Sequence, residues 1–219
     1  MRVYMIRHGM TAGNLEHRYV GSTDEPLLPE SRELIKKCAM QADSRYCMGR
    51  YSIGQSVYVS PLSRCRETAK LLYPDAAQIC IDDLRECDFG LFEYKNYKDL
   101  NGNADYQRFI DTGGCAGFPG GESRDAFIGR TAAGFEVVYK LHLSDHASSV
   151  QCREKDLPDI FMVVHGGTIM ALLDRYARPK RSYYDWQVKN GQGYSMEFMQ
   201  DETGYWFADI NLFDIRDFI

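Results

Sequence analysis

The sequence predicts an α/β fold: a three-layer α/β/α sandwich whose sheet is mostly parallel and has an antiparallel edge strand. Residues 3–6 and 160–164 form continuous apolar runs, which are typical of strands buried on both faces of a parallel sheet. Segments with apolar residues at helical spacing alternate with the predicted strands, as they do in α/β folds. Residues 194–199 and 206–210 alternate apolar and polar side chains around a turn, which predicts a hairpin at one sheet edge.

Local signals place the individual elements. Pro29 suits a first helical position, and Glu30 is favourable near the positive end of the helix dipole. Pro61 ends a short strand and comes directly before the next helix. Apolar residues at a spacing of three and four predict the remaining helices. The expected helices cover residues 29–47, 62–73, 104–112, 123–146 and 166–176, and the expected strands cover residues 3–6, 56–60, 79–81, 160–164, 194–199 and 206–210.

Residues 91–121 differ in composition from the rest of the chain. They combine many aromatic residues with Asn, Asp and Gly, which is too polar for a core and too aromatic for a disordered segment. We therefore expect one domain, residues 1–219, with a cap-like insertion at about 91–121 that lies over a pocket. Residues 148–158 are polar and are expected to form a loop in which insertions are tolerated.

Two buried-type strands far apart in the sequence each end in a histidine and a glycine. Arg7, His8 and Gly9 follow the first run, and His165 and Gly166 follow the run at 160–164. Ligands of open α/β sheets bind outside the carboxyl ends of the strands, so both imidazoles are expected to face one crevice. A guanidinium group can bind a phosphate through two hydrogen bonds, and an imidazole can attack it.

Arginines follow a third strand at the same expected edge. Arg64 and Arg66 lie in the first turns of the helix predicted at 62–73, where the helix dipole disfavours cations. For Arg64 this placement favours an anionic ligand. For Arg66 a surface ion pair explains the sequence as well.

Composition excludes several classes of function. The chain has 219 residues, a formal net charge of -5 and a pI near 5.6, which leaves no basic footprint for nucleic acid or anionic membranes. No apolar run approaches the roughly 20 residues of a membrane-spanning helix, and the N-terminus carries no signal-peptide pattern. We expect a cytoplasmic protein with a small-molecule partner; a homodimer stays open.

Cysteine and histidine spacing gives little support for metals or disulfides. The seven cysteines form no C-x-x-C pair, and their odd number is typical of reduced thiols that serve packing. His142 and His146 are one helical turn apart, which is metal-ligand spacing, but no H-E-x-x-H motif or acidic third ligand accompanies them. We predict no metal site.

Five motifs in a fixed order resemble the histidine phosphatase superfamily, also called phosphoglycerate mutase-like. They are Arg7-His8-Gly9-x-Thr11-x-x-Asn14, Ser60-Pro61-Leu62-x-Arg64-x-x-x-Thr68-Ala69, Leu84-Arg85-Glu86, Pro119-Gly120-Gly121-Glu122-Ser123 and Val164-His165-Gly166-Gly167. The resemblance spans almost the whole chain. It implies an α/β/α sandwich that passes phosphate through a covalent phosphohistidine without a metal or other cofactor.

The resemblance also implies roles for individual residues. His8 matches the nucleophile, and Glu86 matches the usual proton donor. Arg7, Arg64 and His165 match the phosphate pocket, with Asn14 and the amide of Gly166 as further donors. Glu86 must be protonated before it can donate, and we expect burial beside Phe89 and Phe92 to raise its pKa. His8 must be neutral, with its other ring nitrogen held by a hydrogen bond.

The sequence favours a phosphatase over a mutase. Residues 87–121 carry three positive and five negative charges and contain no adjacent arginine pair. True phosphoglycerate mutases resemble one another in a cationic lid that includes such a pair. The branch that contains α-ribazole phosphatases and broad-specificity phosphatases is the most similar, so the expected reaction is phosphomonoester hydrolysis. A cofactor-dependent phosphoglycerate mutase remains an alternative. A catalytically silent module that binds phosphorylated ligands is the alternative from another class.

Overall fold

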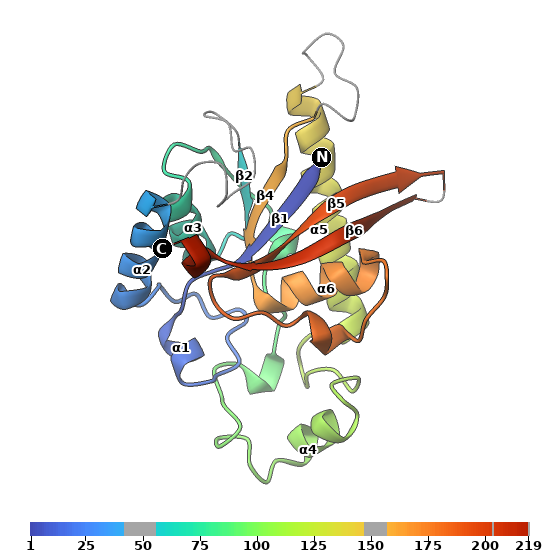
Figure 1. The fold of residues 1–219 in the computed structure, drawn as a ribbon. Coiled ribbons are helices and arrows are strands. Elements are labelled where there is room, and N and C mark those ends of the chain that lie inside the picture. Colours follow the sequence, from blue (N-terminus) through green and yellow to red (C-terminus); the bar gives the residue numbers. More distant parts are fainter. Residues whose placement is uncertain (42–55, 147–156, 203, 219) are drawn as a thin grey trace.

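The computed structural model describes residues 1–41, 56–146, 157–202 and 204–218 (Figure 1). Within them the strands β1 (Arg2–Arg7), β2 (Val57–Val59), β3 (Gln78–Cys80), β4 (Ile160–Val164), β5 (Gln192–Asp201) and β6 (Gly204–Asp214) form one sheet. Their order is β3-β2-β4-β1-β5-β6. The first four pair in parallel, and β5 and β6 add an antiparallel edge. The predicted sheet and its hairpin are confirmed.

Helices cover both faces of the sheet (Figure 1). On one face, α2 (Pro29–Gln41) and α3 (Ser63–Leu72) bury Ile35, Cys65 and Ala69 against strand residues such as Val163. On the other face, α5 (Arg124–His146) and α6 (Gly166–Tyr176) pack through Phe135 and Leu172. The expected helices are found, but the predicted end of the first helix, at residue 47, lies outside the described residues, as does most of the predicted loop at 148–158.

The strand register brings the predicted site residues to one edge of the sheet. Arg7 of β1 pairs with Val164 of β4, and the amide of His8 donates to the Val164 carbonyl over 3.0 Å. On the other side of β4, the amide of Ser60 donates to the Val163 carbonyl over 3.2 Å. Three parallel strands therefore end at the same level, which is where open α/β sheets bind ligands.

The cap-like segment is better packed than its composition suggests. It contains the predicted helix α4 (Ala104–Asp111), and Phe92, Leu100 and Phe109 form a buried cluster of their own. Tyr19, from a different part of the chain, packs its ring against this cluster. The expectation that the segment is too polar for a core was therefore wrong. Figure 1 places α4 at the end of the molecule opposite the N-terminus.

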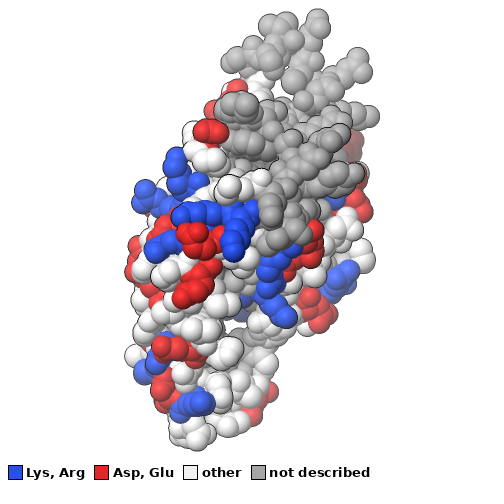
Figure 2. Space-filling view, turned by 60° about the vertical axis from the view of Figure 1, so that its left-hand side comes forward, with Lys and Arg blue, Asp and Glu red and all other residues white. Residues whose placement is uncertain are grey.

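The described part of the surface is charged on the face that Figure 2 shows. Acidic and basic side chains are intermixed there rather than sorted into single-sign patches. Among the described residues, no helix combines the length and the apolar character needed to cross a membrane.

Candidate active site

His8 lies directly after β1 and is almost fully buried. Its Nδ1 lies 2.7 Å from the carbonyl oxygen of Gly9. Because a carbonyl can only accept, Nδ1 carries the proton and Nε2 keeps its lone pair. Burial lowers the pKa of His8 well below its ordinary value, and the charges of Arg64 and Arg7 lower it further. The ring is therefore held in one orientation and in its neutral form, as the predicted nucleophile requires.

Gly9 permits this arrangement because its backbone approaches a packed helix. A Cβ at this position would lie 2.6 Å from both Ile35 Cδ1 and Ser31 Oγ, which is closer than real Cβ contacts. The Gly9 amide donates to Thr68 Oγ1 over 2.9 Å. The glycine in the Arg7-His8-Gly9 motif thus lets the carbonyl that holds His8 sit tightly against α2 and α3.

His165 lies beside His8, as the two strand ends predicted, with ring centroids 5.1 Å apart. Arg64 Nε donates to His165 Nδ1 over 3.3 Å, so Nε2 carries the proton and donates to Ser60 Oγ over 2.7 Å. Burial lowers the pKa of His165 well below its ordinary value, and Arg64, His8 and Arg7 lower it further. His165 is thus also neutral, and both of its ring nitrogens are engaged.

Arg64 is fully buried and points its guanidinium at the backbone. Its Nη atoms donate to the carbonyls of Thr23, Val20 and Gly21 over 2.8 to 3.2 Å. Neither Arg64 nor His165 is among the residues that line the cavity next to His8. The structure therefore brings both residues to the site but places them beside the nucleophile rather than on the cavity wall.

Arg7 presents a buried donor without a partner. Its Nη1 donates to the Val188 carbonyl over 2.6 Å, whereas no hydrogen-bond partner of the buried Nε is found among the described residues. A Cβ at Gly166, on the first turn of α6, would lie 3.3 Å from this Nε. A buried guanidinium nitrogen without a partner is suited to an anion.

Asn14 is held with its oxygen turned away from the ligand space. Thr11 and Asn14 form a capping box at the start of α1 (Ala12–Leu15), in which Asn14 Oδ1 accepts from the Thr11 amide over 3.3 Å. Asn190 Nδ2 donates to the same Oδ1 over 3.0 Å. Asn14 lines the cavity, and its Nδ2 has no partner among the described residues. The amide nitrogen is therefore available as a donor to a ligand.

Glu86 faces the same cavity. Its carboxylate accepts from the amides of Cys87 and Gly167, over 3.0 and 3.1 Å. Burial raises the pKa of Glu86 above its ordinary value, against the opposite effects of these two amides and of Arg64 and Arg7. A Cβ at Gly167 would lie only 2.1 Å from Glu86 Oε1, so the second glycine of the Val164-His165-Gly166-Gly167 motif makes room for the carboxyl.

The aromatic surroundings of Glu86 differ in part from the expectation. Phe89 lines the cavity with Glu86, but Phe92 is buried in the cap cluster and does not. Phe127 lines the cavity instead, and its Cε1 would lie 3.1 Å from the same Cβ at Gly167. The prediction that Phe92 lies beside Glu86 was wrong, because the ring of Phe92 packs against Tyr106 and Phe109 within the cap.

The cavity has a volume of about 330 Å³, which suits a ligand of drug size. Arg7, His8, Asn14, Glu86 and Gly166 of the predicted set line it. The cap and the surrounding elements add an apolar, aromatic wall, which includes Tyr19, Phe89, Phe109, Phe118, Phe127, Met170, Tyr183 and Tyr184. The cavity can thus hold a small polar group at His8 and a larger apolar group under the cap.

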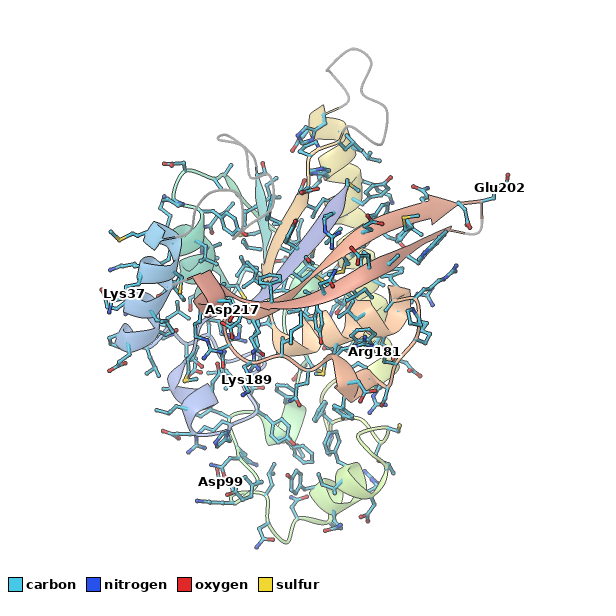
Figure 3. The ribbon with its side chains drawn as sticks, in the orientation of Figure 1. Lys37, Asp99, Arg181, Lys189, Glu202 and Asp217 are labelled. Atoms are coloured by element: carbon cyan, nitrogen blue, oxygen red, sulfur yellow. The ribbon has the colours of Figure 1, made fainter. Side chains whose placement is uncertain are left out.

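Several residues of the cavity were not predicted. Arg18 lines it but is paired with Glu16 and Asp99, the latter labelled in Figure 3. Arg124 lines it without a carboxylate partner among the described residues, and its guanidinium lies 4.8 Å from the ring centroid of Tyr183. No motif marks these residues; only their positions next to the cap in space identify them.

The remaining candidates do not join the site. His142 is buried and its Nε2 donates to the Pro158 carbonyl over 2.9 Å, while Arg66 is exposed. In the described part of the chain, no group of three or more His, Cys, Asp or Glu residues is arranged to hold a metal ion. The described cysteines are free thiols; Cys47 and Cys152 lie outside the described residues.

Comparisons with known proteins relate the chain to one family. The family model for the histidine phosphatase superfamily (branch 1) matches residues 3–207. An adenosylcobalamin/alpha-ribazole phosphatase of Salmonella typhimurium is 26% identical over 204 residues, which cover 87% of each chain. A probable phosphoglycerate mutase of Salmonella paratyphi C is 32% identical over 150 residues, 64% of each chain.

Solved structures share the fold. The alpha-ribazole phosphatase from Shigella flexneri superposes with a TM-score of 0.71 at 22% identity and 95% coverage of both chains. A putative alpha-ribazole-5'-P phosphatase from Escherichia coli gives a TM-score of 0.72 at 22% identity and 96% coverage of both chains. At this identity the likeness concerns the arrangement of the helices and strands.

The lowered pKa values of His8 and His165 lead to a first prediction. Both rings should stay neutral as the pH falls through 6.5, because burial and the neighbouring guanidinium groups disfavour the imidazolium form. Nitrogen-15 NMR of the imidazoles should show fixed tautomers for both residues, with the proton of His8 on Nδ1 and that of His165 on Nε2. A titration midpoint at or above 6.5 for either ring would contradict this electrostatic description.

Proposed function

Because the chain belongs to the histidine phosphatase superfamily (branch 1) and is a phosphatase, we propose that it hydrolyses phosphomonoesters through a phosphohistidine on His8. One observation carries the proposal. On the wall of a single cavity, the structure combines a neutral imidazole with a free Nε2, a buried guanidinium nitrogen without a partner, and a carboxyl of raised pKa. We also propose that residues 1–219 form a single domain, with a cap-like insertion at about 91–121.

His8 Nε2 attacks phosphorus in line with the leaving oxygen. The bond between phosphorus and that oxygen breaks as the bond between Nε2 and phosphorus forms. Gly9 keeps the proton on Nδ1, so the lone pair on Nε2 points into the cavity without any rearrangement. The phosphoenzyme carries an imidazolium-like ring, whose charge the Nδ1 hydrogen bond to the Gly9 carbonyl stabilises.

Donors around His8 bind the phosphoryl oxygens. Arg7, Asn14 and Gly166 line the cavity, and we assign the hydrogen bonds and positive charge to Arg7 Nε, Asn14 Nδ2 and the amide of Gly166 at the start of α6. Arg64 adds a permanent charge close enough to lower the pKa of His8, although its own donors are engaged with backbone carbonyls. His165 packs against the His8 ring in an edge-on arrangement, and hydrogen bonds with Arg64 and Ser60 orient it.

Glu86 acts first as an acid and then as a base. In the first step, its carboxyl proton goes to the leaving oxygen, which departs as an alcohol. In the second step, the carboxylate takes a proton from the attacking water, which displaces His8 and releases inorganic phosphate. The raised pKa of Glu86 keeps the carboxyl protonated to higher pH than an exposed glutamate, which the first step requires.

The aromatic wall supports a finer proposal about the leaving group. Phe89, Phe109 and Phe118 line the cavity beneath the cap, so a flat ring on the alcohol side of the ester would be buried against them. The Salmonella relative and the two structural neighbours are named for α-ribazole or α-ribazole 5'-phosphate. We propose α-ribazole 5'-phosphate, or a range of aryl and nucleoside monoesters, as the substrate.

A phosphoglycerate mutase is the second candidate, favoured by the 32% identical relative of that name. The charge count of the cap counted against it, but the cavity also contains Arg18 and Arg124, which lie outside that interval. Arg18 is neutralised by Glu16 and Asp99. The mostly apolar wall still disfavours a small dianionic acid, so hydrolysis remains the better-supported reaction.

The nucleophile gives the second prediction. Exchange of the imidazole in His8→Ala should abolish hydrolysis of 4-nitrophenyl phosphate, a loss of at least ~10³-fold in kcat, because no other group can carry the phosphoryl. Rapid quench with phosphorus-32 substrate should trap acid-labile phosphate on the wild type alone.

The matched control is His17→Asn. His17 is exposed and has φ 55°, a conformation that asparagine tolerates, so this variant should keep full activity. Turnover by His8→Ala comparable to that of the control would exclude the phosphohistidine route, and phosphate binding without turnover in the wild type would favour the silent binding module.

The acid gives the third prediction. Glu86→Gln should lower kcat/KM, which reports the steps up to the phosphoenzyme, by ~10²-fold or more for phenyl phosphate but much less for 4-nitrophenyl phosphate, because nitrophenolate leaves without a proton. In the wild type, kcat/KM for phenyl phosphate should fall as the pH rises through the raised pKa of Glu86, since the acid form is lost. An unchanged alkaline limb in Glu86→Gln would assign that titration to another group.

Substrate choice gives the fourth prediction. In a screen of α-ribazole phosphate, nucleotides and sugar phosphates, kcat/KM should be higher for esters with a ring in the leaving group. With 3-phosphoglycerate and a bisphosphate primer, free phosphate should form faster than 2-phosphoglycerate. The reverse order of rates would establish the mutase instead.

A further inference from the structure

One short segment between η4 (Tyr183–Trp186) and β5 holds the backbone around the nucleophile. The Val188 carbonyl accepts from Arg7 Nη1 over 2.6 Å, and the Gly191 amide donates to the Arg7 carbonyl over 3.1 Å. Asn190, between them, contacts the residues that follow Arg7. Figure 3 labels Lys189, which marks the place of this segment. Residues 188–191 thus contact the catalytic segment at several consecutive points.

The side chain of Asn190 is the centre of these contacts. Its Nδ2 lies 3.1 Å from the His8 carbonyl, 3.2 Å from the Gly9 carbonyl and 3.0 Å from Asn14 Oδ1. All three atoms are acceptors, so the amide nitrogen faces them and the amide oxygen points away. The two N–H groups of Asn190 are shared among three oxygens and connect the backbone of His8 and Gly9 to the side chain of Asn14.

This arrangement determines which end of Asn14 faces the ligand. The oxygen and nitrogen of an asparagine amide have nearly the same size, so packing alone hardly distinguishes the two orientations. Asn190 Nδ2 and the Thr11 amide both donate to Asn14 Oδ1, and the opposite orientation would bring donors against donors. Asn14 Nδ2 is therefore directed to the cavity, where the opposite orientation would present an oxygen to the phosphate.

The contact with Gly9 serves the nucleophile in the same way. The Gly9 carbonyl that accepts from His8 Nδ1 also accepts from Asn190. Two donors thereby hold the direction of this carbonyl, while the Gly9 amide donates to Thr68 Oγ1. Loss of Asn190 would leave this peptide group, and with it the plane of the His8 ring, less well defined.

We propose that Asn190 is a positioning residue for phosphate binding and phosphoryl transfer, which acts by directing the amide of Asn14 and the carbonyl of Gly9 without touching the substrate. The proposal rests on the proposed function of the same site. It assigns a role in the reaction to a residue that lies in none of the five sequence motifs.

A double-mutant cycle tests the action through Asn14. Asn190→Leu keeps the approximate shape but removes the donor, and the dissociation constant of inorganic phosphate is measured by calorimetry. In the otherwise wild-type chain, Asn190→Leu should weaken phosphate binding about tenfold. The amide of Asn14 can then turn and present its oxygen, which repels phosphate, in place of its donor nitrogen. In the Asn14→Ala background the same change should cost less than about twofold, because there is no amide left to direct.

Controls separate positioning from general structure. Lys189→Ala alters an exposed side chain of the same segment and should leave phosphate binding and the melting temperature unchanged. Equal losses from Asn190→Leu in the two backgrounds would overturn the action through Asn14. If Asn190→Leu does not fold, Asn190→Ala carries the same cycle, because it also removes the donor.

Imidazole NMR supplies a readout that does not depend on turnover. In Asn190→Leu, the nitrogen-15 signals of His8 should change from a single Nδ1–H tautomer to a mixture, while those of His165 stay as they are. An unchanged His8 spectrum would overturn the action through Gly9. If the wild type neither binds phosphate nor hydrolyses esters, the proposed function fails; hydrolysis in the wild type with a normal Asn190→Leu removes only the role of Asn190.

Discussion

The hydrogen bond between His8 Nδ1 and the Gly9 carbonyl is the constraint on which the rest of the site depends. It decides the tautomer, and the tautomer decides whether the imidazole can attack. The surrounding structure is arranged to keep this bond in place. A glycine lets the carbonyl approach α2, Thr68 holds its amide, and the strand register fixes the peptide against β4. The structure around His8 thus keeps the proton of the imidazole on Nδ1.

Several ionisable groups are buried together in the site. The site contains two arginines, two histidines and a glutamate that lie close together away from water. The pKa values of both histidines are lowered and that of Glu86 is raised, so burial favours the neutral form of each of these three groups. Burying an uncompensated guanidinium group costs several kcal/mol. An arriving phosphate dianion would offset this cost, so part of the attraction for the ligand is stored in the folded protein.

Much of the fold could be predicted because it depends on local patterns. The continuous apolar run at 160–164 is β4 itself, and the histidines at two strand ends do meet. The cap was misjudged because its core is completed by Tyr19, which is distant in sequence. The engagement of Arg64 with the carbonyls of Val20 and Gly21, and the contacts of Asn190, depend on loop geometry across the sheet edge. Residue spacing carries no information on such contacts.

The close approach of Glu86 to Gly167 has a consequence for how this fold can lose or change its chemistry. A single methyl group at position 167 would overlap the carboxyl oxygen, while the imidazole of His8 and its bond to Gly9 would be untouched. On the proposed mechanism, such a variant would still transfer a phosphoryl group from an activated ester to His8 but would release it more slowly, because the carboxyl that acts as the base is displaced. Replacement of one glycine thus separates the two halves of the proposed reaction.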